Sequence, residues 1–122
     1  MLRPRRLCAL LDHHGGFTVE PRTGLAMDHG VSVCTEPHLS LHLPGWDSAS
    51  VAGWLAARAD DYHRPGCYVG GWADPANHDV WLDVVRLLPA TWLHAALRAA
   101  GQHGQRGVFD LSRRQLVLVR AS

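Results

Sequence analysis

The chain contains two apolar segments in close succession, Cys67-Tyr-Val-Gly-Gly-Trp-Ala-Asp74 and Asp79-Val-Trp-Leu-Asp-Val-Val85, joined by Pro75-Ala-Asn-His78. Because β-branched and aromatic residues flank a cluster of turn-forming residues, this stretch predicts a β-hairpin. If Ala73 pairs with His78, successive side chains alternate between the two faces of the hairpin. One face then carries Tyr68, Gly70, Trp72, Asp79, Trp81 and Asp83, and the other carries Cys67, Val69, Gly71, Val80, Leu82 and Val84. We expect the apolar face to pack on the core and the aromatic and acidic face to be the surface on which a function would sit.

Shorter strand-like segments lie on both sides of this hairpin. Residues 17–19 and 25–27 flank the turn signal Glu20-Pro-Arg-Thr-Gly24, which predicts a first, short hairpin. Residues 31–34 and 39–43 alternate in polarity on either side of Glu36-Pro37, so 17–43 is most simply a strand meander. Residues 107–111 and 115–119 predict a last hairpin.

Two segments have the apolar spacing of helices. The first is capped at residue 47 or 48 and ends near Tyr62, with Trp54 on its buried side. The second opens at Pro89 and ends at a glycine, residue 101 or 104, with Trp92 or Leu93 against the core. This order of elements predicts an α+β fold, with a single, mostly antiparallel sheet built of hairpins and two main helices packed on one face.

The length and the N-terminal segment predict the domain organisation. At 122 residues the chain is long enough for one domain with a substantial core. Residues 1–14 start basic and become briefly apolar, without the long hydrophobic region of a signal peptide. We expect an N-terminal arm or short helix over 1–14 and a single α+β domain over 15–122. No segment approaches the roughly 20 consecutive apolar residues that a membrane span needs.

Charge and cysteine usage argue against several classes of function. The formal net charge is +1, with acidic and basic residues interspersed, unlike the dense positive field that binds phosphate nonspecifically. All 12 basic residues are Arg, and the chain lacks Lys and Ile, which is typical of a GC-rich coding sequence. Cys8, Cys34 and Cys67 are odd in number and form no Cys-x-x-Cys motif, so we expect reduced thiols in a cytoplasmic protein.

The sequence contains no recognisable catalytic or cofactor-binding motif. Among its 9 histidines, His38 and His42 lie four residues apart on a predicted strand, about 13 Å, and so cannot share a zinc ion. No serine lies in a Gly-x-Ser-x-Gly elbow, and Cys67 falls on the apolar face of the hairpin. We therefore predict no catalytic residue, no metal site and no cofactor.

Asp79 and Asp83 are the acidic residues of the polar hairpin face. They lie on one strand about 13 Å apart, which exceeds the roughly 5–9.5 Å separation of a glycosidase carboxylate pair. We expect Asp79 to cap the turn and Asp83 to pair with an arginine such as Arg86, Arg98 or Arg106. Contact with a ligand is the alternative interpretation.

The glycine pair Gly70-Gly71 and the tryptophans complete the candidate surface. The predicted register places Trp81 across from Gly70, and a ring that packs over a strand glycine explains the pair better than a phosphate-binding loop does. Exposed tryptophan is enriched at interaction sites. We therefore predict a binding surface that contains Trp46, Tyr68, Trp72, Asp79, Trp81 and Asp83.

Several motifs follow one another between residues 15 and 119: Gly16-Phe-Thr-Val-Glu-Pro-Arg-Thr-Gly24, Tyr68-Val-Gly-Gly-Trp72, Val80-Trp-Leu-Asp-Val84, and Gly104-Gln105 leading to Val108-Phe-Asp-Leu111. Together they resemble a class of small proteins and domains of unknown function in actinobacteria, their phages and their mobile elements. The resemblance implies a shared fold and such a source, and it brings no known active site. Val85 stands where a serine is common in that pattern.

These observations predict a small cytoplasmic protein-binding module, an accessory or host-interaction factor of phage or mobile-element type, whose partner is another protein. The first alternative is a small hydrolase or transferase with a site near Asp83, Gln105 and Asp110. A deep pocket that contains Asp83, Gln105 and a histidine would favour this enzyme over a flat aromatic interface. The second alternative is nucleic-acid binding through arginines near the two termini, Arg3, Arg5, Arg6, Arg113 and Arg114.

Overall fold

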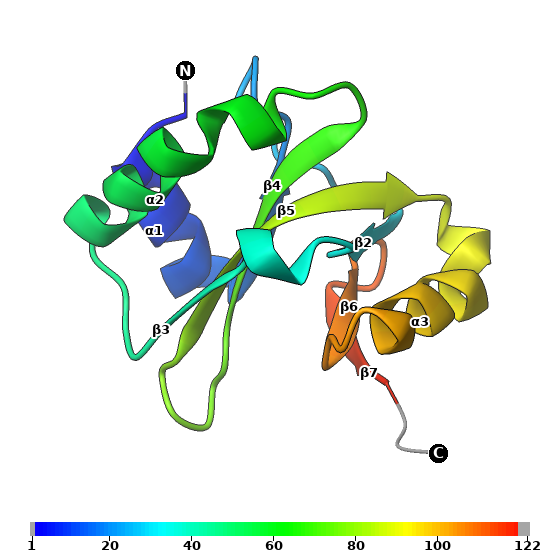
Figure 1. Cartoon of the computed structure of the whole chain (residues 1–122). Helices are drawn as coiled ribbons and strands as arrows, with labels where there is room; N and C mark the ends of the chain where they lie inside the picture. Colours follow the sequence, from blue (N-terminus) through cyan, green and yellow to red (C-terminus); the bar gives the residue numbers. More distant parts are fainter. Residues whose placement is uncertain (1, 120–122) are drawn as a thin grey trace.

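A long hairpin occupies the centre of the fold (Figure 1). The computed structural model describes residues 2–119. Strand β4 (Cys67–Ala73) and strand β5 (Val80–Leu88) pair antiparallel along the whole of β4, which confirms the predicted hairpin. Residues 74–79 form its turn, closed by hydrogen bonds from Asp74 N to Asp79 O and from His78 N to Asp74 O.

The pairing register of this hairpin differs by two residues from the predicted one. Ala73 pairs with Val80 and not with His78. The turn is longer than predicted because the side chains of Asp74 and Asn77 each accept a hydrogen bond from the backbone N–H two residues further on. A shift of two residues leaves every side chain on its predicted face of the sheet but changes the cross-strand partners.

The hairpin is part of a seven-stranded antiparallel sheet with the order β1-β4-β5-β2-β6-β7, in which β3 also pairs with β5. The remaining strands are β1 (Gly16–Val19), β2 (Val31–Val33), β3 (Leu41–Leu43), β6 (Gly107–Asp110) and β7 (Gln115–Leu118). Strands β6 and β7 form the predicted C-terminal hairpin. The α+β class with one mostly antiparallel sheet is therefore confirmed.

The N-terminal strands pair differently from the prediction. Strand β1 pairs with β4, and only the bridge between Val19 and Ala26 remains of the predicted first hairpin. The predicted meander is also wrong, because β2 and β3 pair with different parts of β5 and not with each other. The central hairpin offers two long edges of unpaired backbone groups, and the short N-terminal strands satisfy those groups.

The structure contains three α-helices, α1 (Pro4–His14), α2 (Ser48–Tyr62) and α3 (Leu93–Gln102). The cap of α2 is Asp47, whose side chain accepts a hydrogen bond from Ser50 N at 2.7 Å. The second predicted helix begins with the 3₁₀ turn η2 (Ala90–Trp92) before α3. Within residues 2–119, no helix is long and apolar enough to cross a lipid bilayer.

The helices cover one face of the sheet and enclose the core. Helices α1 and α2 pack over β4 and β5, and α3 packs over β2 and β6 (Figure 1). Trp54 is 6% exposed and lies in the core as predicted, together with Leu7 and Leu11 of α1. Trp92 is 55% exposed, and its neighbour Leu93 packs against the core in its place.

The sheet is strongly curled. A Cβ atom added at Gly16 in β1 would lie 3.5 Å from Phe109 Cε2 in β6, although three strands separate β1 from β6 in the sheet order. The curl therefore brings the two ends of the sheet together on the side away from the helices, and that face becomes concave.

Candidate functional site

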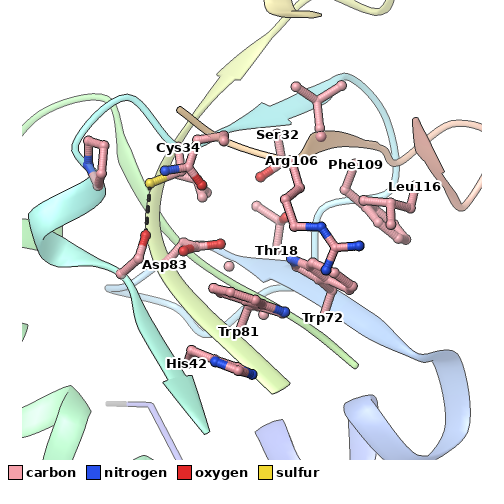
Figure 2. A pocket seen from close by; sticks show the side chains of 18 of the residues that line it. Thr18, Ser32, Cys34, His42, Trp72, Trp81, Asp83, Arg106, Phe109 and Leu116 are labelled. Atoms are coloured by element: carbon pink, nitrogen blue, oxygen red, sulfur yellow. Dashed lines mark hydrogen bonds between the residues drawn. The ribbon is translucent and has the colours of Figure 1, made fainter. Parts of the chain in front are cut away.

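The concave face of the sheet contains a cavity of about 320 Å³, which we call the concave pocket. Its lining comes from β1, β2, β4, β5 and β6 and includes Thr18, Ser32, Trp72, Trp81, Asp83 and Phe109 (Figure 2). The size lies at the lower end of the range for small-molecule sites in proteins. The polar hairpin face predicted from the sequence is therefore the inner wall of a pocket and not a flat surface.

Asp83 lies where β5 loses its second neighbour. Residues 80–82 of β5 pair with β3 and residues 86–88 pair with β2. The chain between β2 and β3, which includes the 3₁₀ turn η1 (Pro37–Leu39), passes this gap. Because Leu41 pairs with Leu82, Ser40 and Cys34 of this segment lie close to Asp83.

The Asp83 side chain is almost completely buried. The residue is 8% exposed, and burial raises the pKa of its carboxyl group from 3.8 to about 6. The nearby Ser40 hydroxyl, which hydrogen-bonds to Cys34 Sγ at 3.2 Å, offsets part of this increase in pKa. The predicted ion pair with Arg86, Arg98 or Arg106 is wrong, since among residues 2–119 no cationic side chain lies within ion-pair distance of Asp83.

Cys34 is the second titratable group of this wall. Its Sγ contacts the Ser40 hydroxyl and lies 3.6 Å from Glu36 O. Burial, followed by the negative charge of Asp83, raises the pKa of the thiol to about 11. Cys34 is therefore a protonated thiol at neutral pH and not a nucleophile.

Three parallel rings form the aromatic wall of the pocket. The ring centroids of His42 and Trp81 lie 4.1 Å apart at 8°, and those of Trp72 and Trp81 lie 5.9 Å apart at 14°. His42 Nε2 also hydrogen-bonds to Asp79 Oδ2 at 2.7 Å. These contacts hold Trp81 in one orientation. Trp81 Nε1 is buried and has no hydrogen-bond partner among the described residues.

The glycine pair has a different packing environment from the predicted one. Trp81 pairs with Trp72, and Gly70 pairs with Asp83. A Cβ atom on Gly70 would lie 3.0 Å from Val85 Cγ1, and one on Gly71 would lie 2.6 Å from the Phe17 ring. Packing against Phe17 on the helix side excludes a side chain at Gly71, and Val85 leaves little room for one at Gly70, opposite Asp83.

The other predicted binding residues lie outside the pocket or at its rim. Asp79 supports His42 and does not line the cavity. Tyr68 lies at the opposite end of β4. Trp46 is half-buried in the loop before α2, where its Nε1 donates a hydrogen bond to Asp12 Oδ1 at 3.0 Å.

Two residues of the alternative enzyme site are also separated. Gln105 lines the pocket with Asp83, but Asp110 does not. Asp110 Oδ1 instead accepts hydrogen bonds from Ser112 N and Arg113 N and closes the turn between β6 and β7. In the part of the chain that the structure describes, no three side chains of His, Cys, Asp or Glu are grouped as metal ligands.

The sequence patterns did not indicate Thr18, Ser32 or His42 as site residues, and they indicated Arg106 only as an ion-pair partner for Asp83. Strand periodicity could have placed His42 on the face opposite Leu41 and Leu43, but it could not have shown the pairing with Trp81. Thr18 and Ser32 reach the hairpin because β1 pairs with β4 and β2 pairs with β5, whereas Arg106, in the segment before β6, reaches it through the curl of the sheet.

No protein-family model matches the chain, and no curated protein or solved structure shows significant similarity to it. The function is therefore argued from the geometry of the concave pocket.

Proposed function

We propose that the protein binds a small organic molecule in the concave pocket. The pocket combines a fixed aromatic wall with a few polar groups that point into it, which is the usual composition of a ligand site. It also contains Asp83, Gln105 and His42 together, the arrangement that we expected to favour the enzyme alternative over a flat aromatic interface, and an enzyme site of this kind would also bind a small molecule.

The buried carboxyl group of Asp83 is the observation that carries this proposal. A carboxylate without an ion-pair partner destabilises the folded protein when it is buried and ionised. Perturbed titratable groups of this kind are concentrated at functional sites. A ligand that bound the carboxyl group would offset this cost.

The pocket supports binding better than covalent catalysis. The Cys34 thiol is protonated, and the Ser40 hydroxyl contacts that thiol and the Asp83 carboxyl group, without the histidine base of a nucleophilic serine. The pKa of Asp83, about 6, suits proton transfer near neutral pH. If the protein is an enzyme, the reaction that this pocket supports is therefore a proton transfer to or from the bound ligand.

Retention of metabolites by the purified protein tests this proposal. The protein is incubated with a small-molecule extract of the organism in which it occurs, separated from unbound compounds and analysed by mass spectrometry. We expect at least one compound to be retained by the wild type and lost in Trp81→Ala, because that substitution removes the central ring of the aromatic wall.

Trp92→Ala is the matched control, since Trp92 is 55% exposed and does not line the pocket. It should retain the same compound as the wild type. Circular dichroism establishes that both variants are folded. Retention that is equal in wild type and Trp81→Ala would contradict the proposal, as would no retained compound.

Protein binding is a second proposal, and one observation favours it. Trp92 and Leu118 are each 55% exposed, and large apolar side chains on the surface are common at protein interfaces. The resemblance to actinobacterial phage and mobile-element proteins supports a host protein as the partner. Loss of a captured partner in Trp92→Ala, with retention in Trp81→Ala, would show that the partner binds at Trp92 and not in the concave pocket.

Nucleic-acid binding has less support. Arg6 Nη1 donates a hydrogen bond to Gly24 O, and Arg113 Nε lies 3.9 Å from Asp110 Oδ2, so two arginines of the predicted set already have partners. This alternative stays an untested prediction.

A further inference from the structure

The inner end of the concave pocket carries negative charge without compensation. Asp83 is buried beside Ser40 and Cys34, which are neutral groups at pH 7 (Figure 2). The residue opposite it is Gly70, and a Cβ atom there would lie 3.0 Å from Val85 Cγ1 and 3.7 Å from Ser32 Oγ, so only uncharged groups lie across the hairpin from the carboxyl group. A ligand group that reached this end would meet an acceptor with no cationic partner among the described residues.

The aromatic wall next to Asp83 favours the same sign of ligand charge. The faces of indole rings carry partial negative charge and attract cations. His42 stacks on one side of Trp81 at 4.1 Å and Trp72 on the other at 5.9 Å, so Trp72 has the freer indole face of the two and is the ring that a ligand can contact.

The outer end of the pocket has the opposite character. Arg106 is exposed, lines the mouth and extends toward Trp72 (Figure 2). It forms no ion pair with any residue between 2 and 119. Gln105 lies beside it in the chain and also lines the pocket. A guanidinium group in this position suits a carboxylate or phosphate.

We propose that the pocket takes a short zwitterionic ligand with an aromatic or apolar body, whose N–H-bearing cationic end contacts Asp83 and whose anionic end contacts Arg106. This inference rests on the proposed function, because it names the chemical class of the small molecule bound in that same pocket. The ligand lies along the aromatic wall between an acidic inner end and a basic mouth. Its cation replaces the missing ion-pair partner of Asp83.

Four probes that differ only in their terminal groups test this assignment: 4-(aminomethyl)benzoate, benzylamine, 4-methylbenzoate and benzyl alcohol. Binding is followed at pH 7.5 through tryptophan fluorescence and backbone amide NMR shifts of the full chain. We expect benzylamine to bind at least about tenfold more tightly than the alcohol, because charge-assisted hydrogen bonds are stronger than neutral ones. We expect 4-(aminomethyl)benzoate to bind more tightly still.

Two variants assign the two ends of the ligand. Asp83→Asn should lower the affinity for benzylamine to that of the alcohol and the affinity for 4-(aminomethyl)benzoate to that of 4-methylbenzoate, and leave alcohol binding unchanged. Arg106→Ala should remove only the advantage of 4-(aminomethyl)benzoate over benzylamine. Arg106 is exposed, and NMR spectra of each variant establish that it keeps the native fold.

The outcomes separate the ligand class from the binding function itself. Equal affinity for alcohol and amine, tightest binding of 4-methylbenzoate, or amine binding that is unchanged in Asp83→Asn would overturn the zwitterion assignment and leave a small-molecule site. Shifts outside the concave pocket, or none with any probe, would overturn this assignment. The proposed function would then be decided separately by the metabolite-retention experiment.

Discussion

Asp83 shows how a single position in the register creates an unusual chemical environment. It belongs to the polar face of the hairpin, yet the sheet curls over that face and removes water from it. Ser40 is its nearest polar neighbour, and it supplies no positive charge. The carboxyl group is therefore retained at a position where the fold alone would favour a neutral residue.

The stability of the protein should depend on the ionisation of Asp83. The pKa of this group is about 6 in the folded state and 3.8 ordinarily, so the folded state holds the proton more tightly. Between these values the folded protein binds more protons than the unfolded chain, and the contribution of Asp83 to stability falls as pH rises through this window. Above pH 6 the ionised carboxylate has its full unfavourable effect, on the order of 3 kcal/mol.

Asp83→Asn tests this expectation because asparagine stays neutral. Urea unfolding should show the variant to be more stable than the wild type at pH 8, with the difference shrinking toward pH 4. The other titratable or charged groups that line this pocket are Cys34, His42 and Arg106, and the variant keeps all of them. The exposed Asp60→Asn is the control, and the same gain there would refute a specific role for burial at Asp83.

Gly71 should tolerate no side chain. A Cβ atom there would lie 2.6 Å from two atoms of the buried Phe17 ring, and overpacking of this kind costs about 1–3 kcal/mol. We expect Gly71→Ala to lower the free energy of unfolding by that amount in urea titrations. Gly53→Ala is the matched control: Gly53 is exposed in α2 with open space around it, so alanine should stabilise the protein slightly. Equal effects of the two substitutions would contradict the packing argument.

Among the elements, β5 determines the positions of the strands that pair with it. It pairs with β4 along one edge and with β3 and β2 in succession along the other. The short stretch between those two partners is the place where Asp83 meets the segment from Cys34 to Ser40. A continuous partner strand along β5 would have covered this position with backbone, and the pocket would have had a different floor.

Helix α1 is an integral part of the core and not only an appendage. Leu7 is 1% exposed and packs with residues of α2 and the sheet. Leu7→Ala should therefore lower the free energy of unfolding by about 2–5 kcal/mol. The neighbouring Arg5→Ala, at an exposed position of the same helix, should leave it nearly unchanged. A loss below about 1 kcal/mol for Leu7→Ala would indicate that α1 detaches without consequence.

For the molecule as a whole, the helices cover one face of the curled sheet, and the concave pocket lies on the other face. Two hydrophobic clusters hold this shape, one under α1 and α2 and one under α3. Phe109 of β6 and Gly16 of β1 approach each other across the concave side. The pocket therefore depends on the packing of both clusters.

Thiol labelling should detect the unfolding that exposes the buried cysteines. Cys34 and Cys67 are each 5% exposed, and the pKa of Cys34 is about 11, so neither should react while the protein is folded. Cys8 is half-buried and should react first, although burial raises the pKa of its thiol too. Mass spectrometry after iodoacetamide treatment at pH 8 should show one modified cysteine in the native protein and three in urea. Rapid native labelling of Cys34 would contradict the closed wall of the pocket.

Much of the local structure could be read from the sequence. Turn residues and the alternation of side chains located the central and C-terminal hairpins, and the face of each residue between 67 and 85 was correct. Apolar spacing and a cap located α2, as the bond from Ser50 N to Asp47 confirms. These features depend on interactions within a few residues, which a linear pattern records.

The long-range arrangement could not be read in the same way. The partners of β1, β2 and β3 depend on which edges of the central hairpin are free, and the turn at Asp74–Asp79 moved the register by two residues. Asp83 was placed on the correct face, but its burial results from the pairing of β2 with β5, which brings Ser32 near it, and from the curl, which brings Arg106 and Phe109 to the same pocket. Sequence alone determined which side chains share a face. Tertiary packing decided whether that face met water or enclosed a pocket, because solvent exclusion depends on contacts between segments far apart in the chain.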